Sequence, residues 1–105
     1  MVIKETSIFT KRIIDILSDD EYRKLQIKLV KNPEIGTTIP GSGGLRKMRW
    51  NIIGKGKRGG IRIIYYWFTA GSIVLMLFVF KKNERSDLDK KQLIELRKIV
   101  MKEFL

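Results

Sequence analysis

Arginine and lysine side chains are the groups in this sequence whose types and spacing could do chemistry. Arg62 stands near the start of an apolar segment and follows the basic, glycine-rich stretch 54–60. Lys81 and Lys82 follow a second apolar segment. If the two segments are strands joined by a short turn, these cations meet at one end of a sheet, where they could hold a phosphate together.

Cations gathered around a phosphodiester could support cleavage of RNA by its own 2′-hydroxyl. That reaction needs a base for the hydroxyl proton, neutralisation of the charge at phosphorus and an acid for the leaving oxygen. A guanidinium suits the second task, which makes Arg62 its candidate. A lysine crowded by other cations favours its neutral form and can then act as a base. The candidates for proton transfer are Lys55, Lys57 and Lys82.

The positive charge is concentrated in the middle of the chain. The formal net charge is +11, and residues 35–83 hold nine bases and no acid, whereas each flank is nearly balanced. A solvated surface normally mixes the two signs, because unpaired like charges repel. We therefore expect a polyanion such as a phosphate backbone as the partner, with a basic surface kept for solubility as the alternative. The further RNA-binding residues predicted are Arg46, Lys47, Arg49, Arg58, Lys81 and Tyr66.

Two absences narrow the chemistry. The chain contains no cysteine and no histidine, which removes disulfides, thiolate nucleophiles, the usual zinc ligands and every Ser/His/Asp arrangement. We expect neither a metal ion nor a cofactor. Tyrosines at strand spacing more often pack in a core than stack on bases, so Tyr65 and Tyr66 carry both interpretations.

The amino-terminal third predicts a weak strand and a helical pair. Val2–Ile8 resembles a strand, and Phe9–Leu17 a short helix with its apolar residues, Ile14 among them, on one side. Ser18 is placed as the N-cap of a second helix, with Glu21 completing a capping box. Asn32 and Pro33 end that helix.

The rest of the chain predicts a turn-like bridge over residues 34–44, three strands and a last helix. The strands are marked by apolar residues over 45–53, 61–68 and 73–80. Residues 63–80 form an uncharged run long enough for a membrane helix, but a Thr-Ala-Gly-Ser turn at its middle favours two strands. Ser86 is expected to begin the last helix, with Asp89 in the capping-box position.

These elements indicate a single α+β domain over residues 1–105. A helical pair comes first, a small twisted antiparallel sheet next, and a helix last. The amino terminus lacks the pattern of a secretory signal, so we expect a cytoplasmic location without a membrane.

Three motifs carry a family resemblance: GSGGLRKMRW at 41–50, GKGKRGGIRIIYY at 54–66 and KKNERSDL at 81–88. Together with the order of elements, they resemble a HigB-type member of the RelE/ParE toxin superfamily. The resemblance implies a RelE-like fold whose sheet cradles messenger RNA, which such toxins usually cut on the ribosome. It also implies a cognate antitoxin, generally encoded beside the toxin and often DNA-binding.

Matched by position, Arg62 corresponds to the family's arginine at the start of the third strand. Lys55 and Lys57 correspond to its basic loop, and Lys82 to its basic residue after the last strand. The chain departs from the RelE pattern at Asp89, where a tyrosine often stands, and at Asn83, where a second arginine often stands. A ParE-like inhibitor of DNA gyrase and an RNA- or ribosome-binding module without catalysis stay open as alternatives.

Overall fold

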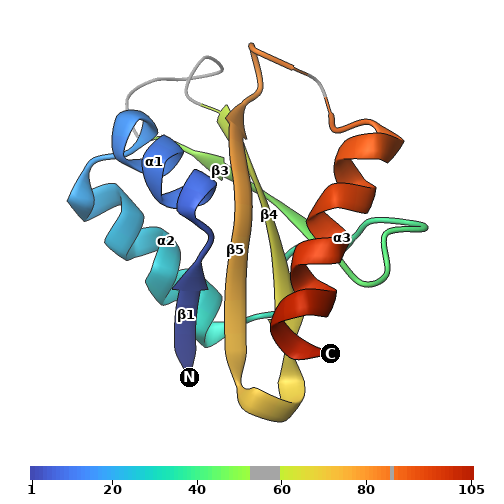
Figure 1. Cartoon of the computed structure of the whole chain (residues 1–105). Helices are drawn as coiled ribbons and strands as arrows, with labels where there is room; N and C mark the ends of the chain where they lie inside the picture. The colour runs from blue at the N-terminus through green and yellow to red at the C-terminus, as the bar shows by residue number, and fades with distance from the viewer. Residues whose placement is uncertain (53–59, 86) are drawn as a thin grey trace.

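The computed structural model describes residues 1–52, 60–85 and 87–105. The elements follow one another in the order shown in Figure 1. They are β1 (Val2–Glu5), α1 (Ser7–Ile16), α2 (Asp19–Lys31), β2 (Thr37–Thr38), β3 (Arg46–Asn51), β4 (Gly60–Phe68), a 3-10 turn (Thr69–Gly71), β5 (Ile73–Lys81) and α3 (Lys90–Phe104).

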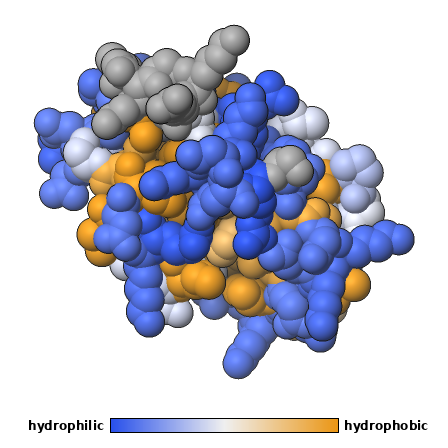
Figure 2. Space-filling model, turned by 90° about the horizontal axis from the view of Figure 1, so that it is seen from above, coloured by the Kyte–Doolittle hydropathy of each residue, from blue (hydrophilic) through white to orange (hydrophobic). Residues whose placement is uncertain are grey.

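The strands form one sheet in the order β1-β5-β4-β3-β2. The predicted antiparallel strands β3, β4 and β5 are confirmed, and β5 ends at the top of Figure 1, the side that faces the viewer in Figure 2. The sheet is mixed rather than antiparallel throughout, because β1 runs parallel to β5. The two-residue strand β2, which was not predicted, pairs with β3 inside the expected turn region.

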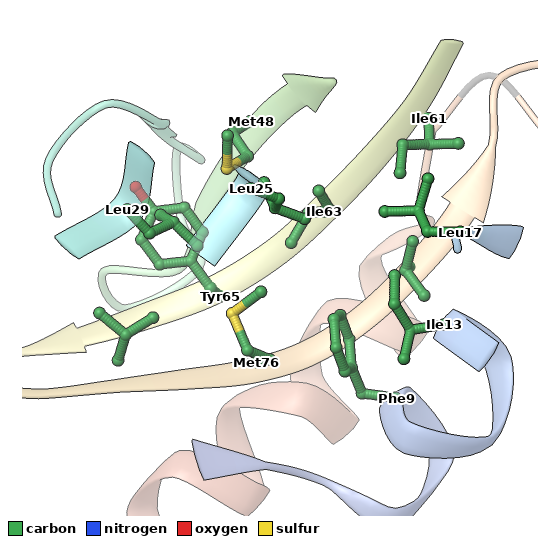
Figure 3. Packing of buried hydrophobic residues seen from close by; sticks show 12 residues of the cluster. Phe9, Ile13, Leu17, Leu25, Leu29, Met48, Ile61, Ile63, Tyr65 and Met76 are labelled. Carbon is green, nitrogen blue, oxygen red and sulfur yellow. The ribbon is translucent and has the colours of Figure 1, made fainter. Parts of the chain in front are cut away.

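The helical pair covers one face of the sheet. Phe9, Ile13 and Leu17 from α1 and its C-cap, with Leu25 and Leu29 from α2, pack against inward-pointing strand residues such as Tyr65 (Figure 3). Residues four positions apart lie on the same side of a helix, so in each helix one row of apolar side chains faces the sheet. The prediction that Ile14 shares the stripe is wrong: its position is turned about 100° from Ile13, and its side chain is 71% exposed.

The start of α2 is the predicted one. Ser18 is its N-cap and accepts a hydrogen bond from the Glu21 N–H at 3.2 Å. The predicted capping box is not formed, since the Glu21 carboxylate accepts a hydrogen bond from the Trp50 indole at 3.2 Å, which ties α2 to β3.

Helix α3 covers the other face through Leu96 and Val100, with Leu93 and Phe104 beside them. The helix begins at Lys90 rather than at Ser86, which lies outside the described residues. Asp89 is itself the N-cap, and Gln92 completes the capping box. Asp89 therefore takes the N-cap position that was predicted for Ser86, rather than the capping-box position three residues after it.

The uncharged run at 63–80 forms two strands, as predicted. A 3-10 turn joins them and ends at Ser72, whose φ of 50° is left-handed. Within the described ranges, no helix is long and apolar enough to cross a membrane.

Candidate nucleic-acid interface

The start of β4 and the end of β5 lie side by side. Arg62 is opposite Phe80, Ile61 is opposite Lys81, and the Lys82 N–H donates to the Gly60 carbonyl at 3.0 Å. The surface at this end of the molecule is largely hydrophilic (Figure 2). The backbone thus brings Arg62 and Lys82 to one end of the sheet, as the sequence predicted.

Strand alternation then selects which cations share a face. Arg49 is directly opposite Arg62 in the β3–β4 ladder, and Lys47 is opposite Ile64. Ile64 belongs to the core under α3, so these three cations project from the α3 face of the sheet. Like charges directly opposite each other repel, so an anion bound here is favoured.

The Arg62 side chain is only 8% exposed, although it is charged. In the described part of the chain, its single hydrogen bond runs from Nη1 to the Ile61 carbonyl at 3.3 Å. A guanidinium carries five N–H donors in a fixed fork. Among the described residues, the other donors of this fork have no protein acceptor, so phosphate oxygens could serve as their partners.

One acid lies among these cations. The Lys47 ammonium contacts Asp87 Oδ2 at 2.9 Å, and Asp87 Oδ1 accepts the Leu88 N–H at 2.9 Å. The hydrogen bond from Lys47 is the main reason that the pKa of Asp87 lies below its ordinary value, and the charge of Arg62 also lowers it. Sequence reasoning missed Asp87, which stands just past the acid-free segment 35–83.

The end of β5 is held in place by α1. Glu84 accepts hydrogen bonds from the Lys81 N–H at 2.8 Å and from Arg12 Nη2 at 2.6 Å, and Arg12 Nε also donates to the Val79 carbonyl at 2.6 Å. The Lys81 N–H is the main cause that lowers the pKa of Glu84, and Arg12 lowers it further. These bonds fix the turn that carries Lys82, which is exposed.

Other predicted residues lie elsewhere. Arg46 is opposite Tyr65 on the face of the helical pair, where Nη1 donates to the Gly36 carbonyl at 2.7 Å and to the Glu34 carbonyl at 3.3 Å. Lys81 is opposite Ile61 and so shares that face.

Tyr66 is on the α3 face, four residues and about 13 Å beyond Arg62 along the strand. Its ring stacks on Phe104 with 5.9 Å between the ring centroids, so it packs against α3. The predicted residues Lys55, Lys57 and Arg58 lie outside the described residues.

A surface hollow beside the cations could receive part of a ligand. It has a volume of about 430 Å³ and lies along the β2 side of β3. Its lining residues are Ile35, Thr37, Lys47, Met48 and Arg49. In the part of the chain that the structure describes, no group of three or more carboxylates lies close enough to hold a metal ion.

Comparison with known proteins decides the family. The family described as the RelE toxin of the RelE/RelB toxin-antitoxin system matches residues 9–104, nearly the whole chain. The chain belongs to the RelE toxin family. It is therefore a toxin of a toxin-antitoxin system.

Solved structures agree with this RelE fold. The E. coli toxin RelE, as a mutant in the free state, is similar over 99% of this chain and 97% of its own, with a TM-score of 0.60 and 15% identity. The E. coli RelBE toxin-antitoxin complex contains a chain similar over 76% of this chain and 94% of its own, with a TM-score of 0.56 and 15% identity. At this identity the likeness concerns the fold.

Proposed function

We propose that this RelE-family toxin is an endonuclease that cuts messenger RNA on the ribosome, and that a cognate antitoxin neutralises it. The observation that supports this best is the facing pair Arg49 and Arg62, with Lys47 on the same face. Three cations on adjacent strands suit a ribose-phosphate chain, which carries one negative charge per nucleotide.

In this proposal, Arg62 neutralises the charge that develops on the scissile phosphate. Its guanidinium is held by burial before the substrate arrives, so little reorganisation is needed as the negative charge grows. The 2′-oxygen attacks phosphorus, its proton passes to a base, and the 5′-oxygen leaves with a proton from an acid. Lys82 and the predicted loop lysines Lys55 and Lys57 are the candidates for these proton transfers.

The finer assignments also belong to the proposal. The three sequence motifs support a HigB-like member of the family. The proposed target, the ribosome, implies that the toxin acts in the cytoplasm. Residues 1–105 are proposed to form a single toxin domain. The similar E. coli RelBE structure is a complex of toxin and antitoxin, and a cognate antitoxin is proposed as the partner of this chain too. No metal or cofactor is required by the roles above.

The test is brief expression of the toxin in growing cells, followed by mapping of new 5′ ends in messenger RNA. We expect cuts within translated regions, and we expect the double variant Arg62→Ala with Lys82→Ala to abolish both the cuts and growth arrest. Intact transcripts together with DNA damage would favour gyrase as the target instead. A double variant as toxic as the parent would show that the site is elsewhere.

A further inference from the structure

The ion pair between Lys47 and Asp87 joins β3 to the segment just before α3. The two residues are 40 positions apart in sequence, and the contact places a carboxylate on the cationic face described above. Asp87 is 56% exposed and Lys47 28% exposed, so the pair lies open to solvent and to a ligand. An exposed pair of this kind contributes little to stability.

The carboxylate uses the contacts that a phosphate would use. It binds the Lys47 ammonium at 2.9 Å and lies close enough to Arg62 to be influenced by its charge. A phosphate bound by Lys47 would compete for the same ammonium, because both anions present oxygen acceptors to it. Both anions cannot remain there without repelling each other.

We infer that Asp87 occupies, in the free protein, the place of an RNA phosphate at Lys47, and thereby weakens RNA binding. Asp87 is a built-in competitor that RNA must displace. This inference rests on the proposed function, because it assumes that the α3 face of β3 and β4 binds RNA.

Removal of the negative charge of Asp87 tests the inference, because the inference predicts a gain in RNA affinity rather than a loss. Asp87→Asn keeps an oxygen that can accept the Leu88 N–H, so the local turn is retained, but it cannot form the ion pair. We expect a short RNA with 2′-O-methyl groups, which cannot be cleaved, to bind about three- to tenfold more tightly at low salt, where screening is weak. Loss of structure would weaken binding, so a gain cannot arise from misfolding.

Glu103→Gln is the matched control, because it makes the same change in net charge elsewhere. Glu103 pairs with Lys4 at 3.2 Å, and its side chain is exposed like that of Asp87. The control should bind the RNA as the parent does. An equal gain in both variants would overturn the inference, since net charge alone would then explain it.

A second pair of variants locates the effect. In a Lys47→Met background, Asp87→Asn should tighten binding less than it does in the parent, because the cation that Asp87 pairs with is already gone. An undiminished gain would contradict the assignment to Lys47. If Asp87→Asn binds RNA more weakly than the parent, the carboxylate positions Lys47 instead of competing with RNA. If the affinity for RNA is unchanged, the carboxylate has no effect on binding. Either result overturns the inference.

The variant Arg62→Ala shows whether a negative result concerns only the inference about Asp87 or also the proposed RNA site. If Arg62→Ala weakens RNA binding while Asp87→Asn has no effect, the RNA site stands and only the inference is wrong. If Arg62→Ala leaves RNA binding unchanged, the proposed RNA site is wrong, and the inference about Asp87 is wrong with it.

Discussion

The two faces of the sheet use arginine in opposite ways. On the face of the helical pair, Arg46 donates to the carbonyls of Glu34 and Gly36 and holds the loop before β2. On the α3 face, Arg49 and Arg62 face each other, and no acid forms an ion pair with either within the described residues. Satisfied donors stabilise a fold, whereas unsatisfied cations favour an anionic ligand. Arginines that are neighbours in one basic motif therefore have different roles: Arg46 stabilises the fold, whereas Arg49 is free to bind an anion.

Tyr65→Phe should have the largest effect on stability. The Tyr65 hydroxyl accepts the Gly36 N–H at 2.8 Å and donates to the Pro33 carbonyl at 2.7 Å, and the side chain is fully buried. Its loss leaves two groups without a partner, so unfolding should need about 2–4 kcal/mol less free energy. Urea unfolding measures this, with Tyr66→Phe as the control. Equal stability of Tyr65→Phe and the parent would contradict the assigned role.

Arg46→Ala should lower the free energy of unfolding by about 1–2 kcal/mol, because its hydrogen bonds to two carbonyls are lost. Cleavage by the folded molecules should continue at the parent rate, since the side chain lies on the face away from Arg62. Unfolding and cleavage assays on the same preparation check this. Lost cleavage with unchanged stability would return Arg46 to the RNA-binding residues that the sequence predicts.

Stability should fall at alkaline pH. Burial raises the pKa of Tyr65 above its ordinary value of 10.0, and burial with the hydrogen bond to Glu5 raises the pKa of Tyr22. As the pH rises, the two tyrosine hydroxyls lose their protons in the unfolded chain before they lose them in the folded chain. The free energy of unfolding is therefore unaffected below about pH 10 and declines above it by up to about 1.4 kcal/mol per pH unit for each tyrosine. Unfolding measured from neutral pH upward checks this, and Tyr65→Phe should lessen the decline. A constant stability across that range would contradict it.

Arg49→Ala should change stability least, with a gain of about 0.2–1 kcal/mol, because the repulsion from the facing Arg62 is removed. RNA binding should weaken, and the slope of log affinity against log salt should become shallower by about 1, since one phosphate contact is lost. Titrations at several salt concentrations measure the slope. An unchanged slope would exclude Arg49 from the RNA contacts.

Periodic residues made most of the fold predictable. In β4, for example, simple alternation places Ile64 and Tyr66 on one face and Ile61, Ile63 and Tyr65 on the other, as the structure has them. The parallel pairing of β1 with β5 was not predictable in this way, because it depends on contacts across about 70 residues rather than on a local pattern. The strand β2 has two residues, too few to show any alternation.

The candidate site was predictable only in part. The alternation within β3 could have separated Arg46 from Lys47 and Arg49, but the face of each residue is known only once its register with β4 is known. Asp87 carries no local signal, since its contact with Lys47 spans 40 residues. The roles of Lys55, Lys57 and Arg58 stay predictions from the sequence.

If the cations on the α3 face cut messenger RNA, the rate of cleavage on purified ribosomes must depend on Arg62. The parent, Arg62→Ala and Arg23→Ala are compared, since Arg23 lies exposed on α2 and its loss makes the same change in charge. We predict that Arg62→Ala slows cleavage by about a hundredfold or more, while Arg23→Ala cuts at the parent rate. Cleavage by Arg62→Ala at the parent rate would show that Arg62 has no part in the reaction.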